Sequence, residues 1–195
     1  MTAARSVRLI LASASPRRLE LLGRLGVTPD AVVPPAIDET PLEAELPARY
    51  ACRMATEKAA AAAVESGALV LAADTVVAAG RRILPKAETE GEARAALELL
   101  SGRRHRVHSA VAVADAAGRM RLRLSTSLVA FKRLSAEEIE AYLASGEWRG
   151  KAGGYAIQGR AEALVRRLSG SHSGVMGLPL YETRALLRAA GYPLG

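Results

Sequence analysis

Cysteine is nearly absent from this sequence. Cys52 is the single cysteine among 195 residues, so no disulfide can form within the chain. A chain of this size without disulfides is typical of a reducing compartment, and we expect it in the cytoplasm. The cysteines and histidines also lack the spacing of a structural zinc site. These absences exclude a disulfide-stapled scaffold and a zinc-finger-like module.

Aromatic residues are also scarce, at 4% of the chain, so the core is expected to consist of alanine, leucine and valine. Proteins that hold single-stranded nucleic acid use aromatic stacking platforms, which this composition does not favour. The sequence has no apolar run long enough to span a bilayer and no signal-peptide pattern at its N-terminus. We therefore expect no membrane attachment.

Positive charge is what the sequence has in excess, with a formal net charge of +7. Such a surface favours anionic ligands, which include nucleic acids, nucleotides and membrane headgroups. The basic residues are not gathered in a tail but form short clusters: Arg17-Arg18, Arg81-Arg82, Arg103-Arg104-His105-Arg106 and Arg166-Arg167. Charge alone therefore does not choose among these ligands.

The order of elements predicts an α/β protein with a mixed sheet, formed by one domain or by two small lobes around a cleft. Strand and helix alternate in the N-terminal half, whereas adjacent strands follow later. Strands are predicted at residues 7–12, 31–33, 68–77, 104–115, 119–131, 155–158 and 162–168. Helices are predicted at residues 16–25, 47–66, 90–100, 135–144 and from about 179 to 190.

The segment from Ser13 to Arg18 joins the first strand to the first helix. Ser15 is a good N-cap residue, and Pro16 is pre-organised for the first helical position. The N–H groups and the positive dipole end of that helix would face the loop, beside two serine hydroxyls and the forked side chains of Arg17 and Arg18. The segment predicts a polyphosphate cradle; the alternative is a capped surface helix with solvated arginines.

Asp74 stands within the most hydrophobic stretch of the chain, residues 68–77. An unpaired carboxylate there would be costly to desolvate, so Asp74 must lie at a strand end, pair with a base or bind a metal. We interpret it as a general base or Mg²⁺ ligand; the alternative is an aspartate that bonds a turn. Glu39, on the proline-flanked loop 37–41, would by itself be a solvated acid. Together with Asp74 it completes an oxygen-ligand site, because Mg²⁺ needs only one or two carboxylates besides water and phosphate.

Three further polar residues could contact a phosphorylated ligand. Lys58 lies in an alanine-rich helix, where the alternative is a solvated helix face. Lys86 follows a proline at a strand end and could reach a phosphate. Gln158 lies in a glycine-framed strand, where a buried amide can read the edge of a base; the alternative is an internal glutamine with satisfied hydrogen bonds.

Nucleophilic serine catalysis is not favoured. The three histidines are too scattered for a metal triad, and no Gly-x-Ser-x-Gly elbow is present. The small-residue loop 169–174 is better interpreted as structural or substrate-lining.

At these positions the sequence resembles the Maf family of nucleoside triphosphate pyrophosphatases, over nearly the whole chain. The resemblance is specific because many motifs occur in order. They are Leu11-Ala12-Ser13-Ala14-Ser15-Pro16-Arg17-Arg18, Asp38-Glu39-Thr40-Pro41, Glu57-Lys58-Ala59, Ala73-Asp74-Thr75-Val76-Val77, Pro85-Lys86, Leu100-Ser101-Gly102, Lys151-Ala152-Gly153-Gly154-Tyr155-Ala156-Ile157-Gln158-Gly159 and Val175-Met176-Gly177-Leu178-Pro179-Leu180.

The resemblance implies an inosine-triphosphatase-like α/β fold over residues 1–195, with two lobes around a central cleft and commonly a homodimer. It implies that Mg²⁺ or Mn²⁺ supports hydrolysis of a nucleoside triphosphate to the monophosphate and pyrophosphate. By position, Asp74 matches the catalytic acid, and with Glu39 it would hold the metal. The other positions that match the family's site are Ser13, Arg17, Lys58, Lys86 and Gln158. We add Arg18, from the predicted phosphate cradle, to the candidate substrate-binding residues. Those associated with substrate choice are Arg17, Thr75 and Gln158.

The subgroup also follows from the resemblance. The branch that prefers dTTP and UTP carries Ala-Asp-Thr and Tyr-x-Ile-Gln-Gly, as Thr75 and Gln158 stand here. The branch that prefers 7-methyl-GTP carries Ser-Asp-Gln and a glutamate instead. A neutral amide suits the O4/N3–H edge of uracil or thymine, whereas a carboxylate suits a cationic methylated guanine.

Two alternatives stay open. One is a nucleic-acid-binding or septum-inhibiting regulator without turnover, which the charge permits and the lack of aromatics and recognition motifs disfavours. The other is a house-cleaning pyrophosphatase for non-standard nucleotides, such as 7-methyl-GTP or modified pyrimidine and inosine nucleotides, with the same chemistry.

Overall fold

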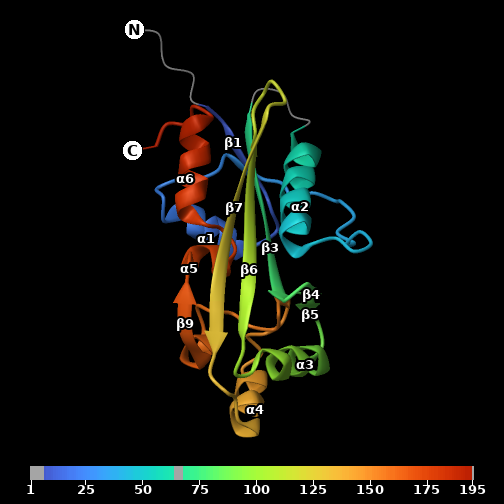
Figure 1. Cartoon of the computed structure of the whole chain (residues 1–195). Helices are drawn as coiled ribbons and strands as arrows, with labels where there is room; N and C mark the ends of the chain where they lie inside the picture. The colour runs from blue at the N-terminus through green and yellow to red at the C-terminus, as the bar shows by residue number, and fades with distance from the viewer. Residues whose placement is uncertain (1–6, 64–67, 195) are drawn as a thin grey trace.

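A twisted sheet runs through the computed structural model, which describes residues 7–63 and 68–194 (Figure 1). Its strand order is β2-β1-β3-β6-β7-β9, with β4 paired to β3. The strands are β1 (Leu9–Ala12), β2 (Ala31–Val32), β3 (Leu69–Ala79), β4 (Arg82–Leu84), β6 (Arg104–Ala114), β7 (Met120–Phe131) and β9 (Val165–Ser169). The β2-β1-β3 pairings are parallel and the others are antiparallel, so the predicted mixed sheet is confirmed. A separate pair of short strands joins β5 (Lys86–Ala87) to β8 (Lys151–Ala152).

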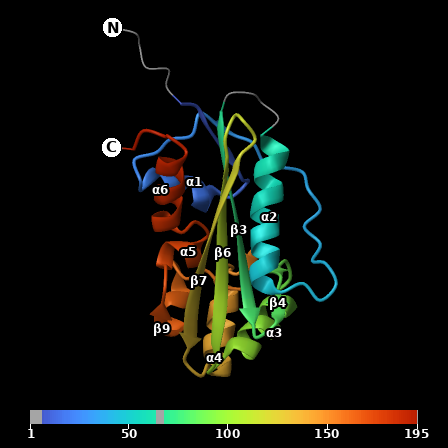
Figure 2. The same ribbon diagram turned by 45° about the horizontal axis from the view of Figure 1, so that its top comes forward.

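Helices cover both faces of the sheet. Figures 1 and 2 show α2 (Pro47–Ala62) on one face, α1 (Pro16–Gly23) and α6 (Leu180–Ala189) on the other, and α3 (Glu90–Leu100) and α4 (Ala136–Ala144) at the far end of the long strands. Under α2 the core is built largely from alanines of the helix and of β3 and β6, whose small side chains let the helix approach closely. The opposite core is larger and contains leucines, valines and Trp148. Within the described residues, no helix is long and apolar enough to cross a membrane.

Local sequence signals account for most helix boundaries. Both capping boxes form: Thr89 with Glu92 starts α3, and Ser135 with Glu138 starts α4. Helix α1 ends at Gly23 rather than at residue 25, and Gly26 follows with a φ of 69°. Helix α2 ends at Ala62; the rest of the predicted helix includes residues 64–66, which lie outside the described part of the chain.

The predicted strands in the glycine-rich region are partly wrong. Residues 155–158 form no strand, because Gly153 and Gly154 both have φ of 69° and turn the backbone out of the extended conformation. Of the predicted strand 162–168, the first part is a 3₁₀ helix, η1 (Arg160–Leu164), and only β9 is extended. The Glu147 carboxylate accepts a hydrogen bond from the backbone N–H of Arg160, at 2.8 Å, and so stabilises the start of η1. The small-residue loop 169–174 leads into a short helix, α5 (His172–Met176).

Strand β3 changes its partner on one side along its length, and this opens the site. Its first part pairs with β1 up to Ala72, and its last part pairs with β4 from Val77 onward. Residues 73–76 lie between these two pairings, next to the loop that leaves β1. Because successive side chains of a strand point to opposite faces, Asp74 and Thr75 reach this opening from the two faces of the sheet.

Candidate active site

The candidate site is a cavity of about 340 Å³ at this interruption of the sheet. Its walls come from the β1–α1 loop, the loop before α2, α2 itself, β3, the β5–β8 pair with the turn that follows β8, and the end of α5. All of the site residues predicted from the sequence line it: Ser13, Arg17, Arg18, Glu39, Lys58, Asp74, Thr75, Lys86 and Gln158. The folded chain therefore brings together residues that are up to 145 positions apart, counting from Ser13 to Gln158.

A buried lysine joins the two candidate acids. Lys58 Nζ lies 2.7 Å from Asp74 Oδ1 and 2.9 Å from Glu39 Oε1. Lys58 is 6% exposed and Asp74 is 7% exposed, so the solvated helix face that was the alternative for Lys58 is wrong. Asp74 also does not lie at a strand end: it is in the middle of β3 and pairs with a base. This ion pair satisfies the requirement that a carboxylate in an apolar strand be neutralised.

The loop that carries Glu39 is fixed by α2. The Tyr50 hydroxyl donates to the Glu39 carbonyl oxygen at 2.6 Å, and Arg53 donates to the Thr40 carbonyl oxygen at 3.1 Å. Burial acts to raise the pKa of the Glu39 carboxyl, but the ammonium groups of Lys58 and Lys86 outweigh it, so that the pKa lies below its usual range. Glu39 is therefore an anion at neutral pH, held at the cavity wall.

The donor set fits a magnesium-type cation. Asp74 and Glu39 both contact the ammonium group of Lys58, so their carboxylate oxygens lie close together. Hard divalent cations prefer carboxylate oxygens as ligands. Over residues 7–63 and 68–194, no cluster of three or more histidine, cysteine, aspartate or glutamate side chains is placed to hold a metal. A site of two carboxylates therefore fits a metal that also binds water and substrate phosphates, and does not fit a cage made of protein ligands alone.

The β1–α1 loop is organised around Ser13 rather than Ser15. Ser15 occupies the N-cap position of α1, but its hydroxyl forms no capping hydrogen bond, contrary to the prediction. Instead, the Ser13 hydroxyl oxygen accepts hydrogen bonds from the Ser15 backbone N–H, at 3.2 Å, and from Arg18 Nη1, at 3.0 Å. The first turn of α1 is thus left without a side-chain cap at the wall of the cavity, as an anion-binding helix terminus requires.

The two arginines of this loop differ in how firmly they are held. Arg18 Nε donates to the Gly177 carbonyl oxygen at 2.9 Å, in addition to the Arg18 bond with Ser13. Arg17 Nε donates to the Met176 carbonyl oxygen at 3.3 Å. Burial lowers the pKa of both guanidinium groups. Arg18 therefore ties α1 to the end of α5, and Arg17 is the less constrained donor.

The candidate specificity residues occupy different surroundings. Thr75 Oγ1 lies 3.1 Å from Ser109 Oγ and 3.4 Å from the Gly177 carbonyl oxygen. Gln158 is exposed and lies in a turn, so the prediction of a buried amide in a strand is wrong. Its backbone follows the two left-handed glycines, which place it at the edge of the cavity instead of in the sheet.

Sequence reasoning missed several residues of the cavity. Lys151, Tyr155 and Met176 line it but had no assigned role. Lys151 lies in β8, and burial followed by the charge of Arg17 lowers the pKa of its ammonium. The glycine pair that follows Lys151 in the sequence is a signal that could have indicated a cavity residue. Its place beside the strand of Lys86 depends on the pairing of β8 with β5, which the sequence does not show.

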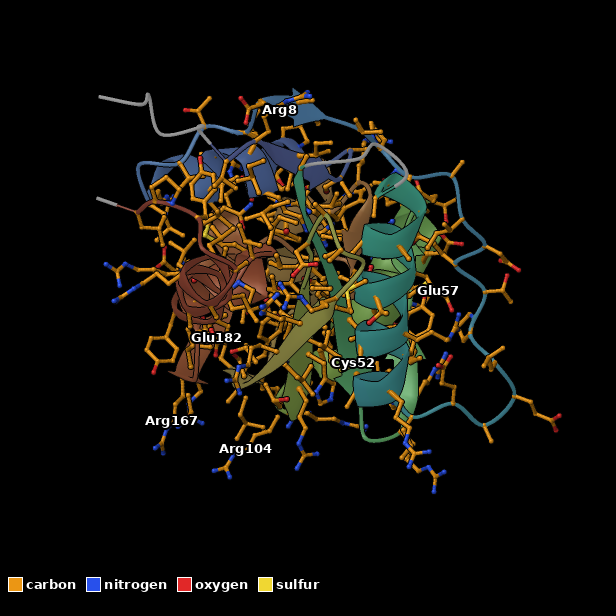
Figure 3. The ribbon with its side chains drawn as sticks, turned by 90° about the horizontal axis from the view of Figure 1, so that it is seen from above. Arg8, Cys52, Glu57, Arg104, Arg167 and Glu182 are labelled. Carbon is orange, nitrogen blue, oxygen red and sulfur yellow. The ribbon has the colours of Figure 1, made fainter. Side chains whose placement is uncertain are left out.

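Other basic residues lie outside the cavity. Figure 3 shows Arg104 and Arg167 pointing away from the body of the molecule. They flank Ala130 in the register of β6, β7 and β9. The positive charge of the chain is thus divided between the cavity and its outer surface.

The cavity residue Tyr155 contacts a buried histidine, His105. The hydroxyl of Tyr155 lies 2.8 Å from His105 Nε2, and His105 is 2% exposed. Both rings stack edge-to-face with Phe131. Burial lowers the pKa of His105 from 6.5 to about 4, so its ring is neutral at neutral pH.

This buried histidine predicts a loss of stability in acid. Between pH 6.5 and 4 the unfolded chain binds a proton at His105 that the folded chain does not, so the free energy of unfolding falls as pH falls. We expect this group to remove about 2 kcal/mol between pH 7 and 5. Urea unfolding at both pH values measures it, and a His105→Asn variant should lack this part of the pH dependence. An equal pH dependence in both proteins would contradict a neutral buried ring.

Comparison with known proteins adds to this geometry. A family model described as Maf-like protein matches residues 8–190. A protein of Novosphingobium aromaticivorans named dTTP/UTP pyrophosphatase is 66% identical over 189 residues, which cover 96% of this chain and 94% of that protein. A protein of Zymomonas mobilis with the same name is 63% identical over 187 residues, covering 95% of this chain and 93% of that protein.

Among solved structures, a HAM1 protein from Coxiella burnetii is similar, with a TM-score of 0.53 and 18% identity, covering 94% of this chain and all of that chain. At this identity the likeness bears on the fold alone, and it confirms the predicted α/β architecture with a sheet flanked by helices. The family model spans most of the sequence and the curated relatives align over nearly their full lengths, so this chain belongs to the Maf family.

Proposed function

We propose that this protein is a metal-dependent pyrophosphatase that hydrolyses dTTP and UTP to the nucleoside monophosphate and pyrophosphate. The observation that carries the proposal is the pair of carboxylates, Asp74 and Glu39, bridged by Lys58 inside a cavity lined by further cations. The names of the two relatives, at 66% and 63% identity, support the same reaction and the same bases.

The charge of the cavity suits a triphosphate. The cavity has only two carboxylates in its lining but five cationic side chains. These cations are Arg17, Arg18, Lys58, Lys86 and Lys151. Arginine forks and lysine ammonium groups are the usual partners of phosphate oxygens, and the start of α1 adds the positive end of a helix dipole. This excess of positive charge favours a polyanionic ligand.

In the mechanism that we propose, Asp74 accepts a proton from the attacking water. Lys58 bonds Asp74 Oδ1, so we assign the proton to Oδ2. Arg17 and Lys86, with the start of α1, stabilise the charge that develops on the leaving pyrophosphate. Asp74 and Glu39 would hold a divalent cation, which neutralises phosphate charge and makes the phosphorus more electrophilic.

The base is selected, in this proposal, by Arg17, Thr75 and Gln158. The amide N–H of Gln158 can donate to O4 of uracil or thymine, whereas cytosine carries an amino group, itself a donor, at that position. Its position at the exposed edge of the cavity suits a group that meets the base as the nucleotide enters.

Replacement of Gln158 by glutamate tests this assignment. The carboxylate cannot donate to O4, so we expect the preference for dTTP over CTP, as a ratio of kcat/KM, to fall about tenfold. Steady-state kinetics with both nucleotides measures the ratio, and Glu162→Gln on η1, outside the cavity lining, is the control. A dTTP/CTP ratio equal to that of the unaltered protein would remove Gln158 from base recognition.

The experiment that tests the function is pyrophosphate release with Mg²⁺ or Mn²⁺ from dTTP, UTP, CTP, dATP, GTP, ITP and 7-methyl-GTP. We expect metal-dependent turnover centred on dTTP and UTP. Turnover centred on another base would keep the reaction and overturn the assigned specificity. Absence of turnover for every nucleotide would overturn the enzymatic proposal.

Family membership also supports two finer assignments, a homodimer and a cytoplasmic location. Light scattering at several protein concentrations tests the first, with twice the monomer mass expected. Fractionation of the source cells tests the second, with the protein expected in the soluble cytoplasmic fraction.

A further inference from the structure

A buried serine connects the candidate specificity residue Thr75 to α5. Ser109 lies directly opposite Thr75 in the pairing of β3 with β6, and it is 1% exposed. Its hydroxyl donates to the Gly174 carbonyl oxygen at 2.5 Å, and its oxygen lies 3.1 Å from Thr75 Oγ1. None of the roles assigned above includes Ser109.

The direction of the hydrogen bonds follows from counting protons. A serine or threonine hydroxyl has one proton to donate. Ser109 uses its proton on the Gly174 carbonyl, which has none to offer in return, so the contact with Thr75 requires the Thr75 hydroxyl as donor. The other acceptor near Thr75, the Gly177 carbonyl oxygen at 3.4 Å, is more distant and already accepts from Arg18 at 2.9 Å. Ser109 is therefore the principal acceptor of the Thr75 proton.

We propose that Ser109 is a positioning residue for base selection, because it takes the proton of Thr75 and leaves the Thr75 oxygen as an acceptor toward the cavity. The proposal rests on the proposed function and deepens it. Uracil and thymine carry an N3–H donor, whereas N3 of cytosine is an acceptor. A hydroxyl that can only accept therefore favours the first two bases, since two facing acceptors leave both unsatisfied.

The same serine also holds the backbone that completes the cavity. Gly174 lies in α5, and the following residues 175–177 line the cavity. The N-terminal end of α5 is held by another buried serine, Ser127 of β7, which accepts from the Ser171 backbone N–H at 2.9 Å and donates to the Ser171 carbonyl oxygen at 3.2 Å. Ser109 differs from Ser127 because it alone of the two also contacts Thr75.

The test compares the UTP/CTP ratio of kcat/KM among variants of the full chain. Ser109→Ala removes the nearer acceptor of the Thr75 proton and leaves the Gly177 carbonyl oxygen at 3.4 Å, a weak acceptor. Thr75 can then turn its proton to cytosine N3, and we expect the ratio to fall about fivefold to tenfold. Ser109→Thr keeps the hydroxyl and should keep the ratio. Ser125→Ala is the matched control, because Ser125 is buried directly opposite Ser109 on β7 and has no contact with Thr75 in the register.

A double-mutant cycle separates this role from a general structural one. In a Thr75→Val protein no hydroxyl remains to be oriented, so adding Ser109→Ala should leave the UTP/CTP ratio unchanged. Binding of UMP and CMP, measured by calorimetry, gives the same comparison without turnover. The unaltered protein could hydrolyse neither UTP nor CTP and still bind UMP more tightly than CMP in a Ser109-dependent way. That result would support the role of Ser109 and overturn the pyrophosphatase proposal.

The proposal is overturned by any of three results. The first is an unchanged ratio in folded Ser109→Ala, and the second is an equal fall in Ser125→Ala. The third is a fall caused by Ser109→Ala in the Thr75→Val background, which would show that Ser109 acts on α5 and not through Thr75. Thermal melting of each variant establishes that it is folded.

Discussion

Replacement of Asp74 by asparagine should lower kcat for UTP and dTTP by about 10²- to 10⁴-fold, the contribution of a positioned general base. The amide keeps the size of the side chain but cannot take the proton of the attacking water. The protein should remain folded, because Lys58 keeps Glu39 as an anionic partner at 2.9 Å. Steady-state kinetics measures the loss, and circular dichroism with thermal melting measures the fold.

Asp38→Asn is the matched control for this experiment. Asp38 is exposed, neighbours Glu39 and accepts a hydrogen bond from the Thr40 backbone N–H at 2.9 Å, which an asparagine oxygen can also accept. Its turnover should therefore stay close to that of the unaltered protein. An Asp74→Asn variant that turns over as fast as Asp38→Asn would show that Asp74 is not the proton acceptor.

Lys58→Met should abolish most turnover and also destabilise the fold. Removing one partner of a buried ion pair leaves an uncompensated charge, here on Asp74, and such changes cost about 3–5 kcal/mol. Glu39 is 40% exposed and contributes less, because solvent screens its charge. We therefore expect a loss near the lower end, about 3 kcal/mol, in urea unfolding without added metal.

Divalent cations should partly reverse this loss. Because Asp74 and Glu39 would face one another without the ammonium group, Mg²⁺ should raise the melting temperature of Lys58→Met more than that of the unaltered protein. Lys86→Met is the control: its side chain is 60% exposed and 3.6 Å from Glu39, so its loss should affect turnover and leave the unfolding free energy nearly unchanged. A Lys58→Met protein as stable as Lys86→Met would contradict the buried ion-pair account.

Much of the fold could be predicted because its signals are local. The capping boxes at Thr89 and Ser135 and the alternation of hydrophobic residues mark the elements without reference to the rest of the chain. Asp74 is predictable for the same reason, since a carboxylate in an apolar strand needs a partner wherever that strand lies. The identity of that partner depends on how α2 packs on β3. The sequence pattern within either segment does not contain this information.

The errors have tertiary causes. The glycine-framed segment predicts a strand around Gln158, but Gly153 and Gly154 adopt left-handed conformations that end extended structure. Ser15 has the residue type of an N-cap, whereas Ser13 takes the hydrogen bonds of the loop. Ser109 gave no signal, because a single serine in a strand of alternating residues is common. Its contact with Thr75 follows only from the register of β6 against β3.

The most direct test of the account is the identity of the products. Phosphorus NMR of UTP incubated with the protein and Mg²⁺ should show UMP and pyrophosphate appearing in equal amounts as UTP disappears. With Asp74→Asn the same change should be at least about a hundredfold slower. Formation of UDP and phosphate, or UTP that persists unchanged with the unaltered protein, would contradict hydrolysis between the α- and β-phosphates at this site.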